Sequence, residues 1–157
     1  MKIDKENLEN VHIPFKKIGA RRMARQVVLQ MLYLCDNCGF SAADALNARL
    51  HDEEDTEPLP VASRNFAKTL LEGIIENRET LDAHIVKYAK NWDLKRMALI
   101  DRNILRLAAY EIVYTPETPV SVIIDEAVEI AKTFSTDESG KFVNGIIDKI
   151  QAERKKK

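Results

Sequence analysis

Apolar residues recur every three or four positions along most of this chain, and this helical period constrains the fold more than any other feature. The clearest series comes last, with Phe142, Val143, Ile146, Ile147 and Ile150 at i, i+3 and i+4 spacing. Only five glycines and five prolines interrupt the chain, and they fall between the periodic stretches. The pattern predicts an all-α protein of about seven helices in two packed antiparallel sub-bundles.

The expected helices follow from where the periodic stretches begin and end. They lie at about 20–37, from Ser41 to about 50, at 61–76, from Asn77 to about 88, at 94–114 with a break near Asp101, at 120–134, and from beyond Asp137 to about 150. Ser41 and Asn77 are predicted N-caps, because a short polar side chain can accept a free backbone N–H. Gly39 ends the first helix, and Trp92 is interpreted as a core anchor in a turn.

The helices are expected to form one domain. Residues 1–19 read as a loosely ordered N-terminal extension, and residues 20–154 as a single all-helical domain with sub-bundles at about 20–77 and 78–154. Residues 51–60 read as an acidic connector, because their like charges repel one another and two prolines block a helix.

Charge and hydropathy restrict the partners that the chain can have. The net charge is −1, so any nucleic-acid site has to come from local clustering of basic residues. No apolar run approaches the roughly 20 residues that span a bilayer. The first 19 residues lack the apolar segment of a secretory signal. We therefore expect no membrane partner and a cytoplasmic location.

No pattern in the sequence indicates an enzyme, a metal site or a cofactor. Cys35 and Cys38 have the spacing of a redox pair or half a zinc site. A redox pair would need a βαβ context, and a zinc site would need two further ligands; the sequence shows neither. Reduced thiols near a helix end are therefore favoured. The glycines are isolated, which leaves no phosphate-binding loop.

Basic residues gather at the start of the first long helix. Arg21, Arg22, Arg25 and Tyr33 share one arc of that helix, opposite the apolar Met23, Val27, Met31 and Leu34. Arginine binds phosphate bidentately, and tyrosine can stack on an unpaired base. Lys16 and Lys17 extend the charge upstream. The arc therefore predicts an RNA-binding face, although a solvated basic helix start has the same pattern.

Charged residues also interrupt the predicted fifth helix, which is otherwise apolar. They are Arg102, Arg106 and Glu111. Because nothing around them indicates a catalytic cleft, they are interpreted as ion pairs between helices.

Several segments in fixed order carry a family resemblance. They are Arg21-Arg22-Met23-Ala24-Arg25, Trp92, Asp101-Arg102-Asn103-Ile104-Leu105-Arg106, Ile124-Asp125-Glu126-Ala127 and Phe142-Val143-Asn144-Gly145. Over about residues 20–150 the chain resembles the NusB family of transcription antitermination proteins.

The resemblance implies two helical sub-bundles, no cofactor and no catalysis. It implies that the chain pairs with NusE, a small-subunit ribosomal protein, and that the pair binds single-stranded boxA RNA. The pair is then expected to join the elongating RNA polymerase complex and to support ribosomal RNA transcription. The free chain could form a homodimer through exposed apolar surface.

The same resemblance assigns RNA contacts to particular positions of this chain. They are Arg21, Arg22, Arg25 and Tyr33 in the first helix, and Glu138, Lys141 and Phe142 in the segment before the last helix. One departure is Met23, which stands at a basic position of the motif and should lower the salt slope of binding by about one. The alternative function is a protein-interaction scaffold with only incidental RNA contact. An RNA methyltransferase activity, known from a fused relative of this domain, lacks its cofactor loop here.

Overall fold

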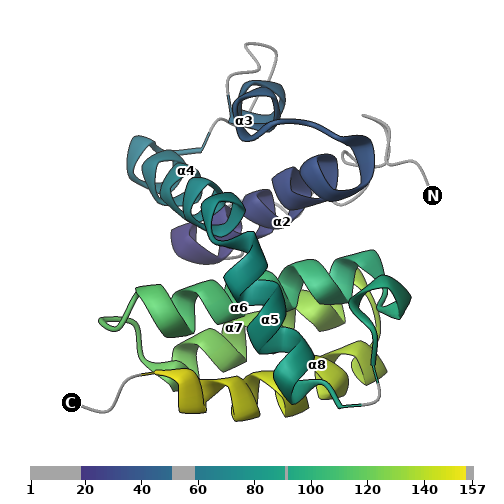
Figure 1. Ribbon diagram of the computed structural model, residues 1–157. Helices are drawn as coiled ribbons and strands as arrows, with labels where there is room; N and C mark the ends of the chain where they lie inside the picture. The colour runs from purple at the N-terminus through teal and green to yellow at the C-terminus, as the bar shows by residue number, and fades with distance from the viewer. Residues whose placement is uncertain (1–18, 51–58, 91, 155–157) are drawn as a thin grey trace. The chain divides into compact units, whose positions relative to one another are not determined.

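The computed structural model describes residues 19–50, 59–90 and 92–154, and within these ranges the chain is helical with no strand. The α-helices are α2 (Ala20–Cys38), α3 (Ala42–Leu50), α4 (Val61–Glu76), α5 (Arg78–Tyr88), α6 (Leu99–Tyr114), α7 (Val120–Phe134) and α8 (Asp137–Ile150) (Figure 1). Two short 3-10 turns are η2 (Leu94–Arg96) and η3 (Gln151–Glu153). The predicted all-α class is confirmed. The predicted extension at 1–19, apart from Gly19, and most of the acidic connector lie outside the described residues.

The chain divides into two compact units, with the boundary between Glu72 and Gly73 inside α4. The sequence placed the boundary at Asn77, one turn later. The first unit contains α2, α3 and the first three turns of α4. The second contains the end of α4 and all later elements.

In the first unit, α2 is bounded by glycines and buried along most of its length. Ala24, Val28 and Met31 have no exposed surface, as expected for a helix that is apolar nearly all round. Gly39 ends the helix with a φ of 74°, and the Phe40 N–H donates to the Leu34 carbonyl at 3.1 Å. The Gly39 N–H donates to the same carbonyl, which is the six-residue closure that a left-handed glycine permits.

Of the two predicted N-caps, one is confirmed and the other works differently. The Ser41 hydroxyl accepts the Asp44 N–H at 3.0 Å at the start of α3. Asn77 stands at the N-cap position of α5, but its side chain makes no cap hydrogen bond there. Its amide donates instead to the Gly73 carbonyl at 2.8 Å, at the end of α4. A single residue joins α4 and α5, and its φ and ψ of −106° and 16° are not the extended values from which a cap reaches forward.

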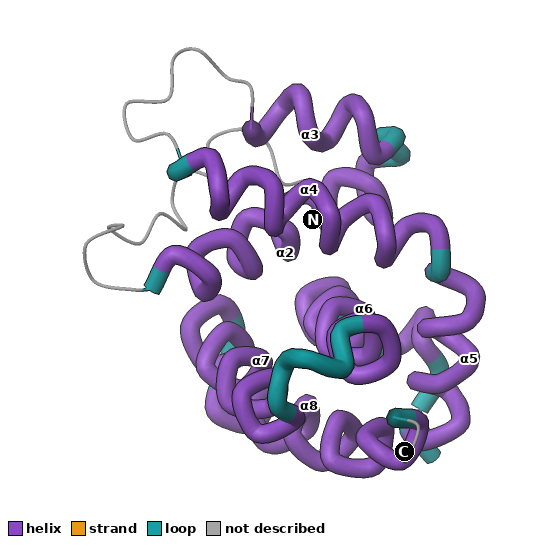
Figure 2. The backbone as a smooth tube through the Cα atoms, turned by 90° about the vertical axis from the view of Figure 1, so that its left-hand side faces the viewer, coloured by secondary structure: helices purple, strands orange, loops and turns teal. Residues whose placement is uncertain are grey.

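In the second unit, α6 contacts α5, α7 and α8, and its residues from Asn103 to Ile112 are buried except Tyr110. Figure 2 looks nearly along α6 and shows these three helices around it. Ile104, Leu105 and Ile112 on α6 are fully buried, so the core of this unit forms around one apolar helix. None of the described helices has the length and apolar character needed to cross a membrane.

The predicted break in the fifth helix exists but is displaced from Asp101. The backbone is extended at Met97 and Ala98, with ψ angles of 145° and 139°, and separates η2 from α6. Asp101 lies in the first turn of α6, where the helix dipole favours an acidic residue, and its carboxylate accepts the Ser139 hydroxyl of α8.

Candidate nucleic-acid interface

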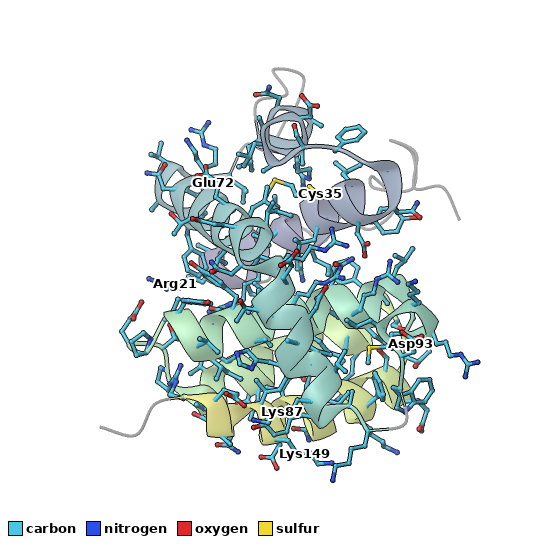
Figure 3. The ribbon with its side chains drawn as sticks, viewed as in Figure 1. Arg21, Cys35, Glu72, Lys87, Asp93 and Lys149 are labelled. Carbon is cyan, nitrogen blue, oxygen red and sulfur yellow. The ribbon has the colours of Figure 1, made fainter. Side chains whose placement is uncertain are left out.

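The first turn of α2 carries an exposed arginine that rests on an aromatic ring of α4. The Arg21 guanidinium lies 4.7 Å from the centroid of the Phe66 ring, and Arg21 is exposed at the beginning of α2 (Figure 3). A cation over a ring is attracted by the quadrupole of the ring, by about 0.5–1 kcal/mol at exposed sites. The contact limits the rotamers of Arg21 and leaves N–H groups at the edge of its guanidinium for a phosphate.

Arg25 departs from the predicted outward orientation. It lies one turn after Arg21, and its guanidinium is 5.5 Å from the centroid of the same Phe66 ring. However, Arg25 is only 3% exposed. Arg22 is half-buried. The expectation that all three arginines face solvent is therefore wrong for Arg25, because α4 provides a ring that takes up its side chain.

Tyr33 also differs from its predicted environment. The residue is 9% exposed, and its hydroxyl accepts the Asn37 amide at 3.1 Å. Its ring is therefore no open platform for a base, since every residue of α2 from Met23 to Leu34 except Gln30 is buried. Lys16 and Lys17 lie outside the described residues.

The second predicted cluster lies in the second unit, inside α8 and not before it. Thr136 caps α8 by accepting the Ser139 N–H at 3.0 Å, so Glu138 falls in the first turn. Lys141 and Glu138 form an ion pair at 3.4 Å with side chains that are 76% and 83% exposed. Phe142 is half-buried. Such an exposed pair is weak and leaves both groups accessible to a ligand.

Trp92 is not the predicted core anchor. It is 50% exposed and packs edge-to-face against Phe142, with ring centroids 5.2 Å apart and an interplanar angle of 70°. The sequence pattern did not show this pair, because the two rings lie 50 positions apart. The role of Phe66 was missed as well, because its spacing with Leu70 and Ile74 is that of an ordinary core stripe.

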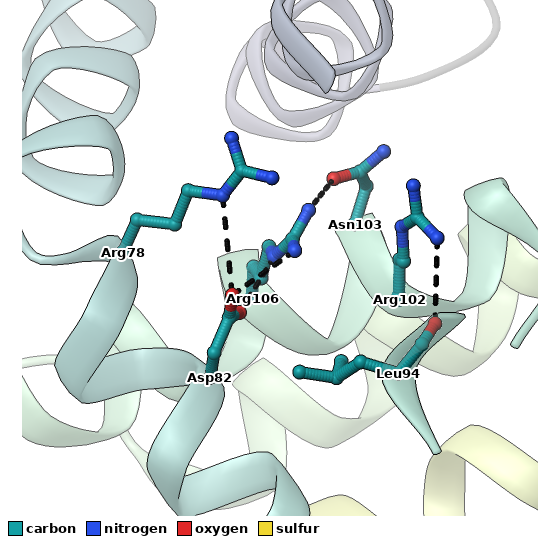
Figure 4. A network of polar contacts seen from close by, with 6 residues as sticks. All are labelled: Arg78, Asp82, Leu94, Arg102, Asn103 and Arg106. Carbon is teal, nitrogen blue, oxygen red and sulfur yellow. Dashed lines mark hydrogen bonds and ion pairs between the residues drawn. The ribbon is translucent and has the colours of Figure 1, made fainter. Parts of the chain in front are cut away.

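The predicted ion pairing between helices is found in the second unit for Arg106. Its guanidinium donates from Nε to Oδ1 of Asp82 at 2.7 Å and from Nη2 to Oδ2 at 3.1 Å (Figure 4). Its Nη1 donates to Asn103 at 3.0 Å. Arg78 approaches Asp82 at 3.9 Å, and Arg102 donates to the Leu94 carbonyl at 3.3 Å.

Neither cysteine forms a disulfide within the described residues; Cys35 is half-buried and Cys38 is exposed. In the parts of the chain that the structure describes, no three His, Cys, Asp or Glu side chains gather closely enough to hold a metal ion.

Comparison with known proteins identifies the family. The profile of the NusB family matches residues 21–152. Transcription antitermination protein NusB of Elusimicrobium minutum (strain Pei191) is 45% identical over 139 residues, covering 88% of this chain and 97% of that protein. The structure of T. maritima NusB is 38% identical, with a TM-score of 0.76, and the match covers 85% of this chain and 92% of that one.

A more distant structural neighbour shares the fold alone. It comes from a crystal structure of the antitermination factors NusB and NusE in complex with dsRNA, and has a TM-score of 0.74 at 22% identity, covering 85% of this chain and 96% of that one. The profile and the relative each span most of this chain, and both name the same family. The chain therefore belongs to the NusB family.

Proposed function

We propose that this chain binds single-stranded boxA RNA together with NusE and joins the elongating RNA polymerase complex, where it supports ribosomal RNA transcription. The curated relative is named a transcription antitermination protein. The neighbour crystallised with NusE and dsRNA supports NusE and RNA as the ligands to test first. A role in transcription would place the chain in the bacterial cytoplasm.

The observation that carries the proposal is the exposed Arg21 guanidinium on Phe66. Arg21, with Arg22 beside it, neutralises backbone phosphates, while the buried Arg25 shares the Phe66 ring and helps to position it. Lys141 adds a further cation in the second unit. The Glu138 carboxylate accepts amino groups at a base edge, and Phe142 offers part of its ring for stacking. Tyr33 is assigned to supporting α2, because its ring is buried.

Substitution of Arg21 tests this role against a matched control. Lys68 on α4 is an exposed cation of the same unit, ion-paired with Glu72 at 3.8 Å. It lies two residues from Phe66, roughly 200° around the helix, so Lys68→Ala removes equal charge without touching the ring. Arg21→Ala should weaken boxA binding several-fold and lower the salt slope by about 0.7, the value for one phosphate of a single strand. Lys68→Ala should change neither.

The measurement is fluorescence anisotropy of labelled boxA RNA at two salt concentrations, with and without NusE. A few phosphate contacts give weak affinity, so the chain with NusE should bind more tightly than the chain alone. Equal loss for the Arg21 and Lys68 variants would contradict the role of α2. If the chain retains NusE in a pull-down but does not raise the affinity of NusE for RNA, the chain acts as a protein scaffold. Sedimentation of the free chain would show whether it forms a homodimer.

A further inference from the structure

We propose that Trp92 is a base-stacking residue, and that an unpaired nucleotide of the bound RNA lies on its exposed indole face. The inference rests on the proposed RNA binding and adds a stacking position that the basic helix α2 does not provide. It follows from the environment of Trp92 in the second unit. There an exposed indole packs against a second ring, and exposed basic residues lie close to both rings in the sequence.

Hydrogen bonds link Trp92 to the end of α5 and cap the turn that follows it. The Trp92 N–H donates to the Ala89 carbonyl at 3.0 Å, directly after α5. On the other side, the Asp93 carboxylate accepts the Lys95 N–H at 3.1 Å and caps η2; Figure 3 labels Asp93 at this connection. The Trp92 backbone is therefore tied to the end of α5 and is followed by a capped turn. A preorganised ring loses less conformational entropy when a base stacks on it.

The partner ring holds the indole without covering it. Phe142 meets Trp92 at an interplanar angle of 70°, so the edge of one ring faces the plane of the other. Such a contact covers at most one face of the indole. Trp92 accordingly keeps 50% of its surface exposed, which is large for a tryptophan in a folded domain. A purine or pyrimidine can occupy the remaining face regardless of sequence, because every base has a π-face.

Basic residues lie close to both rings in the sequence. Lys95 and Arg96 follow Trp92 and are exposed, and Lys141 precedes Phe142. The acidic residues nearest in sequence are Asp93, whose carboxylate caps η2, and Glu138, which pairs with Lys141. Aromatic rings interleaved with lysine and arginine are typical of surfaces that bind single strands, where the cations follow the phosphates.

The charge of this surface favours RNA over a protein as its occupant. An exposed tryptophan can also anchor a protein interface. Lys95, Arg96 and Lys141 would then belong to that interface, but lysine is depleted at interfaces between proteins. A phosphate backbone needs these cations. A protein occupant is therefore an outcome of the test.

Trp92 reports on its own environment, because it is the only tryptophan of the chain. The full chain with NusE is titrated with single-stranded boxA RNA, and indole fluorescence is recorded beside the anisotropy of the labelled RNA. Stacking should quench the indole with the same midpoint as the anisotropy. Because the stacking of a base on an aromatic ring contributes to single-strand affinity, Trp92→Ala should weaken binding about tenfold. Trp92→Phe keeps a ring and should retain most of the affinity, whereas Trp92→Leu should not.

Tyr114→Ala is the matched control, because Tyr114 is an aromatic of the same unit that is 40% exposed and lies at the other end of α6. It should leave RNA affinity unchanged, and circular dichroism should show every variant folded. RNA binding without quenching, and with Trp92→Ala equal to the parent, would overturn the stacking role but leave the proposed function intact. No RNA binding by the parent would refute both. Loss of NusE binding by Trp92→Ala in the absence of RNA would show a protein-docking surface and overturn the inference.

Discussion

The Arg106 guanidinium of α6 holds both carboxylate oxygens of Asp82 on α5, at 2.7 and 3.1 Å. The side chain of Arg106 is only 5% exposed and that of Asp82 is 24% exposed. The pair thus fixes the register of two helices in the second unit. Little water reaches the Arg106 guanidinium at this site.

Removal of that carboxylate should destabilise the fold strongly. Asp82→Ala removes a carboxylate that accepts two hydrogen bonds from a buried guanidinium, and we expect the free energy of unfolding to fall by about 2–3 kcal/mol. Arg78→Ala removes a longer contact to Asp82, 3.9 Å, from a side chain that is 41% exposed, so its effect should be smaller. Urea unfolding of both variants measures the difference. Similar losses would show that the bidentate pair has no special weight.

Acidification should weaken the cluster around Glu153. Hydrogen bonds from Lys87 Nζ at 2.8 Å and the Tyr88 hydroxyl at 2.7 Å hold the pKa of the Glu153 carboxyl below its ordinary value of 4.5. The folded state therefore binds this proton less tightly than the unfolded state. The stabilisation is complete above the ordinary pKa and is lost as the pH falls through the lowered value.

The test compares the parent with Glu153→Gln by urea unfolding from pH 7 down to pH 3. The difference in free energy of unfolding should be constant near neutrality and shrink below about pH 4.5. The hydrogen bond to Glu153 also raises the pKa of Lys87 above 10.5. The contribution of the protonated Lys87 to stability is therefore lost only in strong alkali. Glu72→Gln, which alters an exposed pair, serves as the control. A difference that persists to pH 3 would rule out this linkage.

Arg154 caps the end of α6 and should not be replaceable by lysine. Its guanidinium donates to four backbone carbonyls, those of Glu111, Ile112, Thr115 and Thr118, at distances of 2.8–3.3 Å. The positive charge also suits the C-terminal end of a helix dipole. Arg154→Ala should cost about 1–3 kcal/mol of stability. Arg154→Lys should recover little, because one ammonium group cannot reach all four acceptors. Thermal or urea unfolding measures the stability of both variants. If Arg154→Lys were as stable as the parent, the positive charge of Arg154 alone would account for its effect.

Alanine at Gly73 should destabilise the protein although it favours a helix. A Cβ at Gly73 would overlap the ring of Tyr110, which is stacked on Tyr114 with centroids 5.1 Å apart. The helix gains about 1 kcal/mol from alanine, but the overpacking costs about 1–3 kcal/mol, so we expect a net loss.

Gly145 provides the control, because a Cβ there meets nothing within 4 Å. Gly145→Ala should raise the free energy of unfolding by up to about 1 kcal/mol. If both variants were stabilised, Tyr110 would be free to move aside.

Local sequence signals were enough for most helix boundaries. The predicted ranges 61–76 and 120–134 match α4 and α7, and Gly39 and Ser41 end and begin their helices as expected. These features depend on residues within one turn of each other, so the printed sequence contains them. Asn77 was placed less well, because its amide has a competing acceptor one turn earlier, the Gly73 carbonyl. Asp101 lies inside α6 and accepts a hydrogen bond from Ser139 of α8, a partner 38 positions away that no local signal shows.

The amino-acid sequence by itself determined that this chain is helical, that a basic segment opens α2, and that it resembles the NusB family. Only the tertiary structure decided which cations and rings face solvent. Arg25 and Tyr33 are buried, and Trp92 is half exposed beside Phe142. The physical reason is that helical periodicity states which side chains share a face, whereas burial depends on what another, distant segment brings against that face.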